Sequence, residues 1–439
     1  MAKILNIDGI TLLYEKNKLN KGTYCVFGIK TGAFAEKIWG TAHFLEHMLF
    51  YKTKNRTTEE VKEAEDKLDI GAYTGFDYMC IHFGVSSRLA EESFDVCSDM
   101  FFNCAFDDED MNKERGPILQ EINRTSDNKK RMAKLAHLSK IFNEPRLAIS
   151  AVGTVEDVKK LKEKDLREYQ KENYCKENFV VSVCSNLSVE KIEQLVKKYI
   201  LPHLKSNKHF VAKRRHDQTI VQHNNFLQII KTEQDECSVL LTINTSRNSY
   251  EEYVKRACAS DIMFFVKGKL YKTLREKYGL IYASPGQTTW FTKDNTVKYM
   301  VQLCSKDSIK KVIKYSVEVF ADVVKNGISV EDFEKWKEIS QNEYDVSLQH
   351  PEGIADDMID FYLDCNFVKT LKQIFDAKMK ITREELNAFI KQYFKLDNLQ
   401  LTVSGKVEQN DVPTEKEFFK MVDDAYNKKV SKKVEKSTK

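Results

Sequence analysis

The chain of 439 residues has few glycines (16) and few prolines (6). This scarcity excludes collagen-like segments and long flexible linkers. No uninterrupted apolar run reaches the length of about 18–20 residues that a membrane-spanning helix needs. The first residues, MAKILNIDGITLLYEKNKLNKG, lack the basic, apolar and small-residue regions of a secretory signal. We therefore expect no membrane association.

Several other signatures are missing as well. The ten cysteines are scattered singly, without a CxxC pair, which predicts free, buried thiols and a cytoplasmic location. The net charge of +4 is a small excess of 70 basic over 66 acidic residues, so no nucleic acid partner is expected. Neither GxGxxG nor a Walker A sequence occurs, so a dinucleotide or P-loop site is unsupported.

What the chain does contain is enough apolar material for a globular protein of more than one domain. Hydrophobic residues make up 42% and charged residues 31% of the sequence. The length is large for a single core, so we expect at least two domains.

The two halves of the sequence are similar to each other. Residues 164–184 (KDLREYQKENYCKENFVVSVC) align without a gap with residues 384–404 (EELNAFIKQYFKLDNLQLTVS). Both segments are typical of an amphipathic helix, a turn and an alternating strand. Chance similarity of two helix–strand units is the alternative, but four positions agree at one offset: Leu166 with Leu386, Tyr169 with Phe389, Tyr174 with Phe394, and Asn178 with Asn398. We interpret the repeat as an internal duplication.

The duplication predicts an α+β fold of two homologous lobes, each a mostly antiparallel or mixed sheet with helices on one face. Alternating segments predict strands at 22–30, 78–85, 179–184, 238–244 and 297–304. We expect an N-terminal catalytic lobe at 1–204, a polar linker at 205–225 and a C-terminal lobe at 226–410. A C-terminal helix and a Lys-rich tail are expected at 411–439.

One motif carries metal chemistry. In TAHFLEHMLF (41–50), His43 and His47 are four residues apart, so a helix places both on one face, within reach of one Zn²⁺. Glu46 flanks the same face and could accept a proton from water. The order H-x-x-E-H is that of the inverted zincins. Chance alone produces this motif in about one such chain in a hundred. A catalytic zinc also needs a third protein ligand. Glu121, in NKERGPILQEIN, is the candidate, and Glu114 lies two helical turns before it.

At these residues the sequence resembles the insulysin–pitrilysin metallopeptidases, the family of mitochondrial processing peptidase. GTAHFLEHMLFYKT, ERGPILQEI, LDIGAYTGFDYMCIHFGV and LYKTLREKYGLIYAS are all similar to motifs of that family, and the resemblance spans roughly residues 1–410. It implies a zinc endopeptidase with one Zn²⁺ per chain, held by His43, His47 and Glu121. Glu46 is then the general base, and Glu114 supports the metal ligands.

The resemblance also implies how a peptide is bound. Arg275 and Tyr282 would contact the substrate near the scissile bond. Ala72, Tyr73 and Thr74 would lie on an edge strand that pairs with a short or unfolded peptide inside a closed chamber. Because family members close a clamshell of four lobes, a chain of two lobes is expected to form a homodimer, or a heterodimer with a paralogous chain. The edge-strand motif departs from the family in having glycine at position 71, where asparagine is usual.

Three other interpretations stay open. The two histidines could be ordinary core residues. The chain could be a non-catalytic, peptide-binding subunit of a heterodimeric protease, but such subunits generally lose part of the HxxEH and Glu set, which is complete here. It could also be a structural zinc protein, but such a site usually has four protein ligands, and no fourth is apparent.

Overall fold

The computed structural model describes residues 2–18, 21–142, 144–213, 227–233, 235–246, 249–264, 268–282, 286–291, 295–365, 367, 369–394 and 399–427. The expected linker at 205–225 lies outside these residues from 214 onward, and so does the tail from 428. The chain forms two compact units. The first comprises Met1–Val221, Phe291–Lys293 and Glu338–Met379, and the second comprises Gln222–Trp290, Asp294–Lys337 and Lys380–Lys439.

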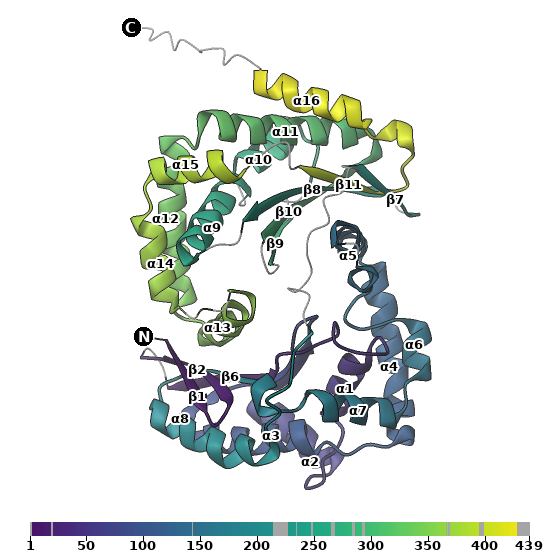
Figure 1. The fold of residues 1–439 in the computed structure, drawn as a ribbon, viewed down its shortest axis with the longest axis vertical. Coiled ribbons are helices and arrows are strands. Elements are labelled where there is room, and N and C mark those ends of the chain that lie inside the picture. The colour runs from purple at the N-terminus through teal and green to yellow at the C-terminus, as the bar shows by residue number, and fades with distance from the viewer. Residues whose placement is uncertain are drawn as a thin grey trace. The chain divides into compact units, whose positions relative to one another are not determined.

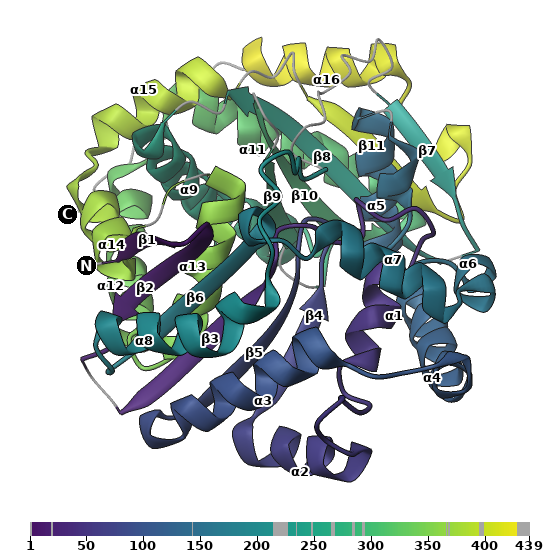
Figure 2. The ribbon, with the colours of Figure 1, turned by 60° about the horizontal axis from the view of Figure 1, so that its bottom comes forward.

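The first unit is built on a six-stranded mixed sheet in the order β1-β2-β6-β3-β5-β4. Its strands are β1 (Lys3–Ile7), β2 (Ile10–Lys16), β3 (Gly22–Ile29), β4 (Ile70–Thr74), β5 (Met79–Ser86) and β6 (Phe179–Ser185). Only the β2–β6 pair is parallel, and the other neighbours are antiparallel. This order leaves β4 at one edge of the sheet (Figure 2).

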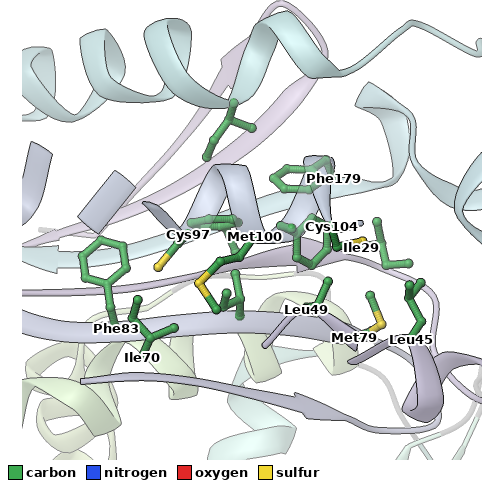
Figure 3. Packing of buried hydrophobic residues seen from close by; sticks show 14 of the residues in the cluster. Ile29, Leu45, Leu49, Ile70, Met79, Phe83, Cys97, Met100, Cys104 and Phe179 are labelled. Carbon is green, nitrogen blue, oxygen red and sulfur yellow. The ribbon is translucent and has the colours of Figure 1, made fainter. Parts of the chain in front are cut away.

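Helices cover one face of this sheet and share its main core. The helices of the N-terminal half are α1 (Thr41–Met48), α2 (Thr58–Leu68), α3 (Ala90–Asn103), α4 (Asp108–Asp127), α5 (Lys129–Phe142), α6 (Val155–Lys160), α7 (Glu163–Asn173) and α8 (Val189–Leu195). Apolar residues alternate along the strands, so every second one points into this core. Figure 3 shows Met79 and Phe83 of β5 beside Leu45 of α1 and Met100 of α3, all of them fully or almost fully buried.

A helix from the second half of the sequence packs against the other face of the same sheet. The C-terminal half contributes α12 (Val330–Ser347), α13 (Pro351–Cys365) and α14 (Leu371–Lys380), and α13 lies on β2, β3 and β6. Its Ala355 and Met358 form a second core cluster with Val180 and Cys184 of β6. The Ser182 hydroxyl donates to the Ala355 carbonyl at 2.7 Å. The central strands are therefore buried on both faces.

The second unit repeats the topology of the first. Its strands are β7 (Leu227–Lys231), β8 (Glu236–Ser246), β9 (Gly286–Phe291), β10 (Asn295–Ser305) and β11 (Gln400–Gly405), in the order β7-β11-β8-β10-β9. Its helices are α9 (Tyr250–Phe264), α10 (Lys269–Tyr271), α11 (Ile309–Asn326), α15 (Arg383–Tyr393) and α16 (Glu415–Asn427). As in the first unit, the late strand inserts beside an early parallel partner, β11 beside β7. Figure 1 shows α11 and α16 packed side by side.

The structure confirms the predicted fold of two homologous α+β lobes. Helix α7 begins at Glu163 and α15 at Arg383, which is the 220-residue offset that the sequence repeat predicts. Leu166 and Leu386 are fully buried at matching positions. The five predicted strands correspond to β3, β5, β6, β8 and β10. In the described part of the chain, no helix is long and apolar enough to span a bilayer.

Candidate metal centre

Helix α1 carries the HxxEH motif and is anchored by its apolar residues. Phe44, Leu45 and Met48 are fully buried in the main core of the first unit. Because these residues fix the rotation of the helix, the remaining face presents His43 and His47, one turn apart. Their rings lie 4.7 Å apart, centroid to centroid, and are inclined by 68°.

Helix α4 brings the third candidate ligand to this face. Its N-terminus is fixed by a capping box between Asp107 and Asp110, and Ile118 and Ile122 are buried on one side. Glu121 then reaches both histidines: its Oε2 lies 3.4 Å from His43 Nε2 and 3.4 Å from His47 Nε2. The structure therefore brings together three side chains whose outermost members, His43 on α1 and Glu121 on α4, are 78 positions apart in the sequence (121 minus 43).

These three residues fit a zinc ion. Ligands of a tetrahedral zinc at 2.0–2.2 Å from the metal are separated by about 3.3–3.6 Å, and the two observed separations are both 3.4 Å. All three ligand atoms lie within 4.8 Å of one another. Two imidazoles and one carboxylate are also a ligand set found in catalytic zinc sites. Within the described residues, no other group of His, Cys, Asp or Glu gathers in this way.

Glu114 lies within hydrogen-bonding distance of one of the two histidines. Its Oε1 lies 2.9 Å from His47 Nδ1, so an Nδ1–H donor leaves Nε2 free to bind a metal. Burial lowers the pKa of His47, but hydrogen bonds to Glu114 and Glu121 outweigh it and raise that pKa to about 9. Hydrogen bonds from His43 and His47 hold the pKa of Glu121 well below its usual range. The His47 imidazole thus lies between the carboxyl groups of Glu114 and Glu121.

Glu46 has a partner on the neighbouring edge strand. The Thr74 hydroxyl donates to Glu46 Oε2 at 2.6 Å, which fixes the direction of this carboxylate. Both side chains are half-buried. Glu46 also borders a cavity of about 510 Å³ between α1, α2, β4 and α4, which is lined by residues that include Glu46, His47, Phe50, Tyr51, Ile70, Ala72 and Glu114.

The edge strand β4 contains all three residues that the sequence assigns to peptide binding. Ala72 packs toward the main core, whereas Tyr73 lies on the opposite face, with its ring 5.3 Å from that of Tyr78. Gly71 is opposite His82 in the β4–β5 register. A Cβ at Gly71 would lie 2.5 Å from His82 Nε2, so a side chain at position 71 would require the His82 imidazole to move. His82 is not among the site residues predicted from the sequence.

Arg275 and Tyr282 belong to the second unit and contact each other. The guanidinium of Arg275 lies 5.2 Å from the Tyr282 ring centroid, within range of a cation–π interaction. Arg275 Nη1 also donates to the Ile281 carbonyl at 3.3 Å. Tyr282 is 83% exposed, so its ring does not belong to the core of its unit.

Comparison with known proteins assigns the family. The sequence profile of the insulinase family (peptidase family M16) matches residues 11–155, and that of the M16 inactive domain matches residues 160–340. The chain belongs to peptidase family M16. The segment of this M16 chain that matches the profile named for an inactive domain, residues 160–340, contains no HxxEH motif.

Relatives of this M16 chain include named zinc proteases. An uncharacterised zinc protease of Bacillus subtilis is 22% identical over 89% of this chain and 95% of its own length. A probable mitochondrial-processing peptidase subunit beta of Arabidopsis thaliana is 29% identical over 36% of this chain and 30% of its own length.

Two solved structures have the same fold. The M16 inactive domain from Pseudomonas fluorescens has a TM-score of 0.79 at 14% identity, covering 93% of this chain and 98% of that chain. The periplasmic protease PqqL of Escherichia coli has a TM-score of 0.73 at 16% identity, covering 98% of this chain and 50% of that chain. At these identities the likeness establishes the fold alone.

Proposed function

We propose that the chain is a zinc-dependent endopeptidase that hydrolyses short or unfolded peptides, with one Zn²⁺ per chain. The observation that carries this proposal is the convergence of His43, His47 and Glu121 at tetrahedral spacing. Glu46 lies beside them on α1, with its carboxylate directed by Thr74. Membership of a peptidase family that includes named zinc proteases supports the same reaction.

In this mechanism each residue of the site has a separate role. Zinc, when bound, acts as a Lewis acid that polarises the peptide carbonyl and lowers the pKa of water. Glu46 accepts a proton on its carboxylate from the attacking water and delivers it to the leaving amine. Glu114 holds His47 in the tautomer that keeps Nε2 available. Thr74 keeps the Glu46 carboxylate pointed in one direction.

The substrate binds as an added strand. Among the described strands, β4 has a neighbour on one side only, so an extended peptide pairs with the main chain of Ala72, Tyr73 and Thr74 on its other side. Arg275 and Tyr282, which belong to the second unit, contribute hydrogen bonds to the bound peptide. A folded protein cannot offer such a strand, which restricts the substrates to short or unfolded peptides held in a closed chamber.

A second chain completes that chamber. The PqqL protease has the fold of this chain over only 50% of its own length, so a protease of this fold can contain about twice as much chain. We propose that a second copy of this chain, or a paralogue, supplies the other half. The rival proposal is a non-catalytic peptide-binding subunit. The complete set of His43, Glu46, His47 and Glu121 supports the enzyme.

Chelation tests the proposal. The purified chain is incubated with an unstructured peptide before and after removal of metal, and zinc is then added back in equimolar amount. We expect cleavage to stop on chelation and to return when one zinc per chain is bound. If the zinc-loaded chain is active only after a paralogous chain is added, a heterodimer is the functional form. A zinc-loaded chain that binds the peptide without cleaving it, alone or paired, refutes the proposed activity.

A further inference from the structure

The N-terminus of α1 is capped by a carboxylate from outside the helix. The N-cap residue Gly40 has φ 94° and provides no side chain to accept hydrogen bonds from the first amides. Glu36 accepts instead, from the Gly40 amide at 2.7 Å through Oε1 and from the Ala42 amide at 2.9 Å through Oε2. A carboxylate at this end also interacts favourably with the helix dipole. The next residue along the helix is His43.

A buried arginine holds this carboxylate in place. Arg146 Nη2 donates to Glu36 Oε1 at 2.8 Å, and the side chains of Glu36 and Arg146 are 0% and 7% exposed. Arg146 also donates to the carbonyls of Ala33, at 3.2 Å, and Ile149, at 2.9 Å. Its guanidinium lies 5.4 Å from the Phe76 ring centroid. The Glu36–Arg146 ion pair therefore lies in the protein interior, where the loss of either partner is destabilising.

The same loop that contains Glu36 is bound to the end of the edge strand. The Ala33 amide donates to the Gly75 carbonyl at 2.9 Å, and the Phe34 amide donates to the Phe76 carbonyl at 3.0 Å. Gly75 and Phe76 directly follow Thr74, the last residue of β4. Arg146 therefore contacts, through Glu36, the start of α1 and, through Ala33 and Phe76, the turn that ends β4.

We propose that Glu36 and Arg146 are positioning residues that fix the start of α1 relative to the end of β4. The inference rests on the proposed function, because α1 carries His43 and Glu46, whereas β4 carries the peptide-binding edge. The Thr74–Glu46 hydrogen bond is the second link between these two elements. The Glu36–Arg146 pair holds the start of α1 and the Thr74–Glu46 hydrogen bond holds a position near its end. Together these two contacts fix the distance between Glu46 and the peptide-binding strand β4.

A purely structural ion pair and a positioning pair differ in what they change. Loss of a structural pair lowers the melting temperature and leaves kcat of the folded fraction unchanged. Loss of a positioning pair lowers kcat, because a displacement of about 1 Å can cost on the order of a hundredfold in rate. KM changes little when the edge strand itself is intact. The visible spectrum of the Co²⁺-substituted protein also changes, because His43 moves relative to His47 and Glu121.

The experiment compares Glu36→Gln with Arg146→Lys and with a control helix cap. Ser188 caps α8 in the same unit by accepting from the Lys191 amide, so Ser188→Ala removes a cap that supports no proposed ligand. We measure kcat, KM, zinc content, the Co²⁺ spectrum and hydrogen exchange of the metal-free protein. Arg146→Lys keeps the charge and loses the planar set of donors, so it carries the test if Glu36→Gln does not fold.

We expect both variants to bind one zinc, to lose about tenfold to a hundredfold in kcat and to show an altered Co²⁺ spectrum. In the metal-free protein, exchange should rise together in residues 40–46 and 70–76, but stay unchanged there in Ser188→Ala. The inference is overturned if folded Glu36→Gln and Arg146→Lys keep the wild-type kcat and spectrum and lose only thermal stability. If the wild type itself does not cleave peptides, the proposed function fails, and the exchange data still decide whether the pair couples α1 to β4.

Discussion

Replacing Thr74 by valine tests how the general base is held. Valine has nearly the shape of threonine but cannot donate the 2.6 Å hydrogen bond to Glu46 Oε2. A hydrogen bond to a charged group contributes about 1.5–3 kcal/mol, which corresponds to about tenfold to a hundredfold in rate. Because both side chains are half-buried, water can replace part of the lost bond. We therefore expect kcat to fall about tenfold in Thr74→Val.

The assay is steady-state cleavage of an unstructured peptide, with zinc content measured on the same samples. Thr74→Ser keeps the hydroxyl and should retain most of the wild-type kcat, whereas the zinc content should equal one per chain in both variants. A Thr74→Val enzyme with wild-type kcat, or one whose loss appears only in KM, would show that the hydrogen bond does not direct Glu46. A parallel loss of zinc would instead assign Thr74 to the stability of the metal site.

Three further predictions concern protons and the metal. Glu114→Gln should weaken zinc binding by about tenfold to a hundredfold, as measured by competition with a chromogenic chelator. An unchanged zinc affinity would show that Glu114 does not support His47 as a ligand. Since the pKa of metal-free His47 is raised to about 9, zinc must displace a proton from this imidazole when it binds. The zinc dissociation constant should therefore fall about tenfold from pH 7 to pH 8. A dissociation constant that does not depend on pH would contradict this prediction. Burial lowers the pKa of His137 to about 3, below the value of about 6.5 in the unfolded chain. The neutral His137 therefore contributes to the free energy of unfolding above pH 6.5, and this contribution is lost below that pH by about 1.4 kcal/mol per pH unit. The free energy of unfolding measured in urea should accordingly depend less steeply on pH in His137→Gln than in the wild type. Equal slopes in the two proteins would refute this prediction.

The features that the sequence predicted correctly depend on short-range patterns. The offset between α7 and α15 follows from helix, turn and strand signals that each span about 20 residues. Strand β5 was predictable because its apolar residues alternate. The HxxEH spacing predicts a shared face for His43 and His47 because helical geometry fixes it. Glu121 was the candidate third ligand in the sequence, a role that the family resemblance also implied, and the structure places its Oε2 3.4 Å from the Nε2 atom of each histidine.

The features that the sequence did not predict depend on packing between distant segments. Nothing in the sequence around Pro351–Cys365 shows that α13 packs on β6, because an apolar helix face does not indicate which element it packs against. Glu36 and Arg146 are 110 positions apart and carry no shared pattern. The close approach of Gly71 to the His82 imidazole follows from the β4–β5 register, and register is a property of the folded sheet.

The most direct test is zinc content and peptide cleavage measured in parallel on the wild type and on Glu46→Gln. Glutamine keeps the shape of the side chain but cannot accept a proton, and Glu46 is not among the three proposed ligands. We expect close to one zinc per chain in both proteins and cleavage only in the wild type. Cleavage by Glu46→Gln at the wild-type rate would contradict the role of Glu46 as the base. Absence of zinc from the metal-replete wild type would contradict the metal centre itself.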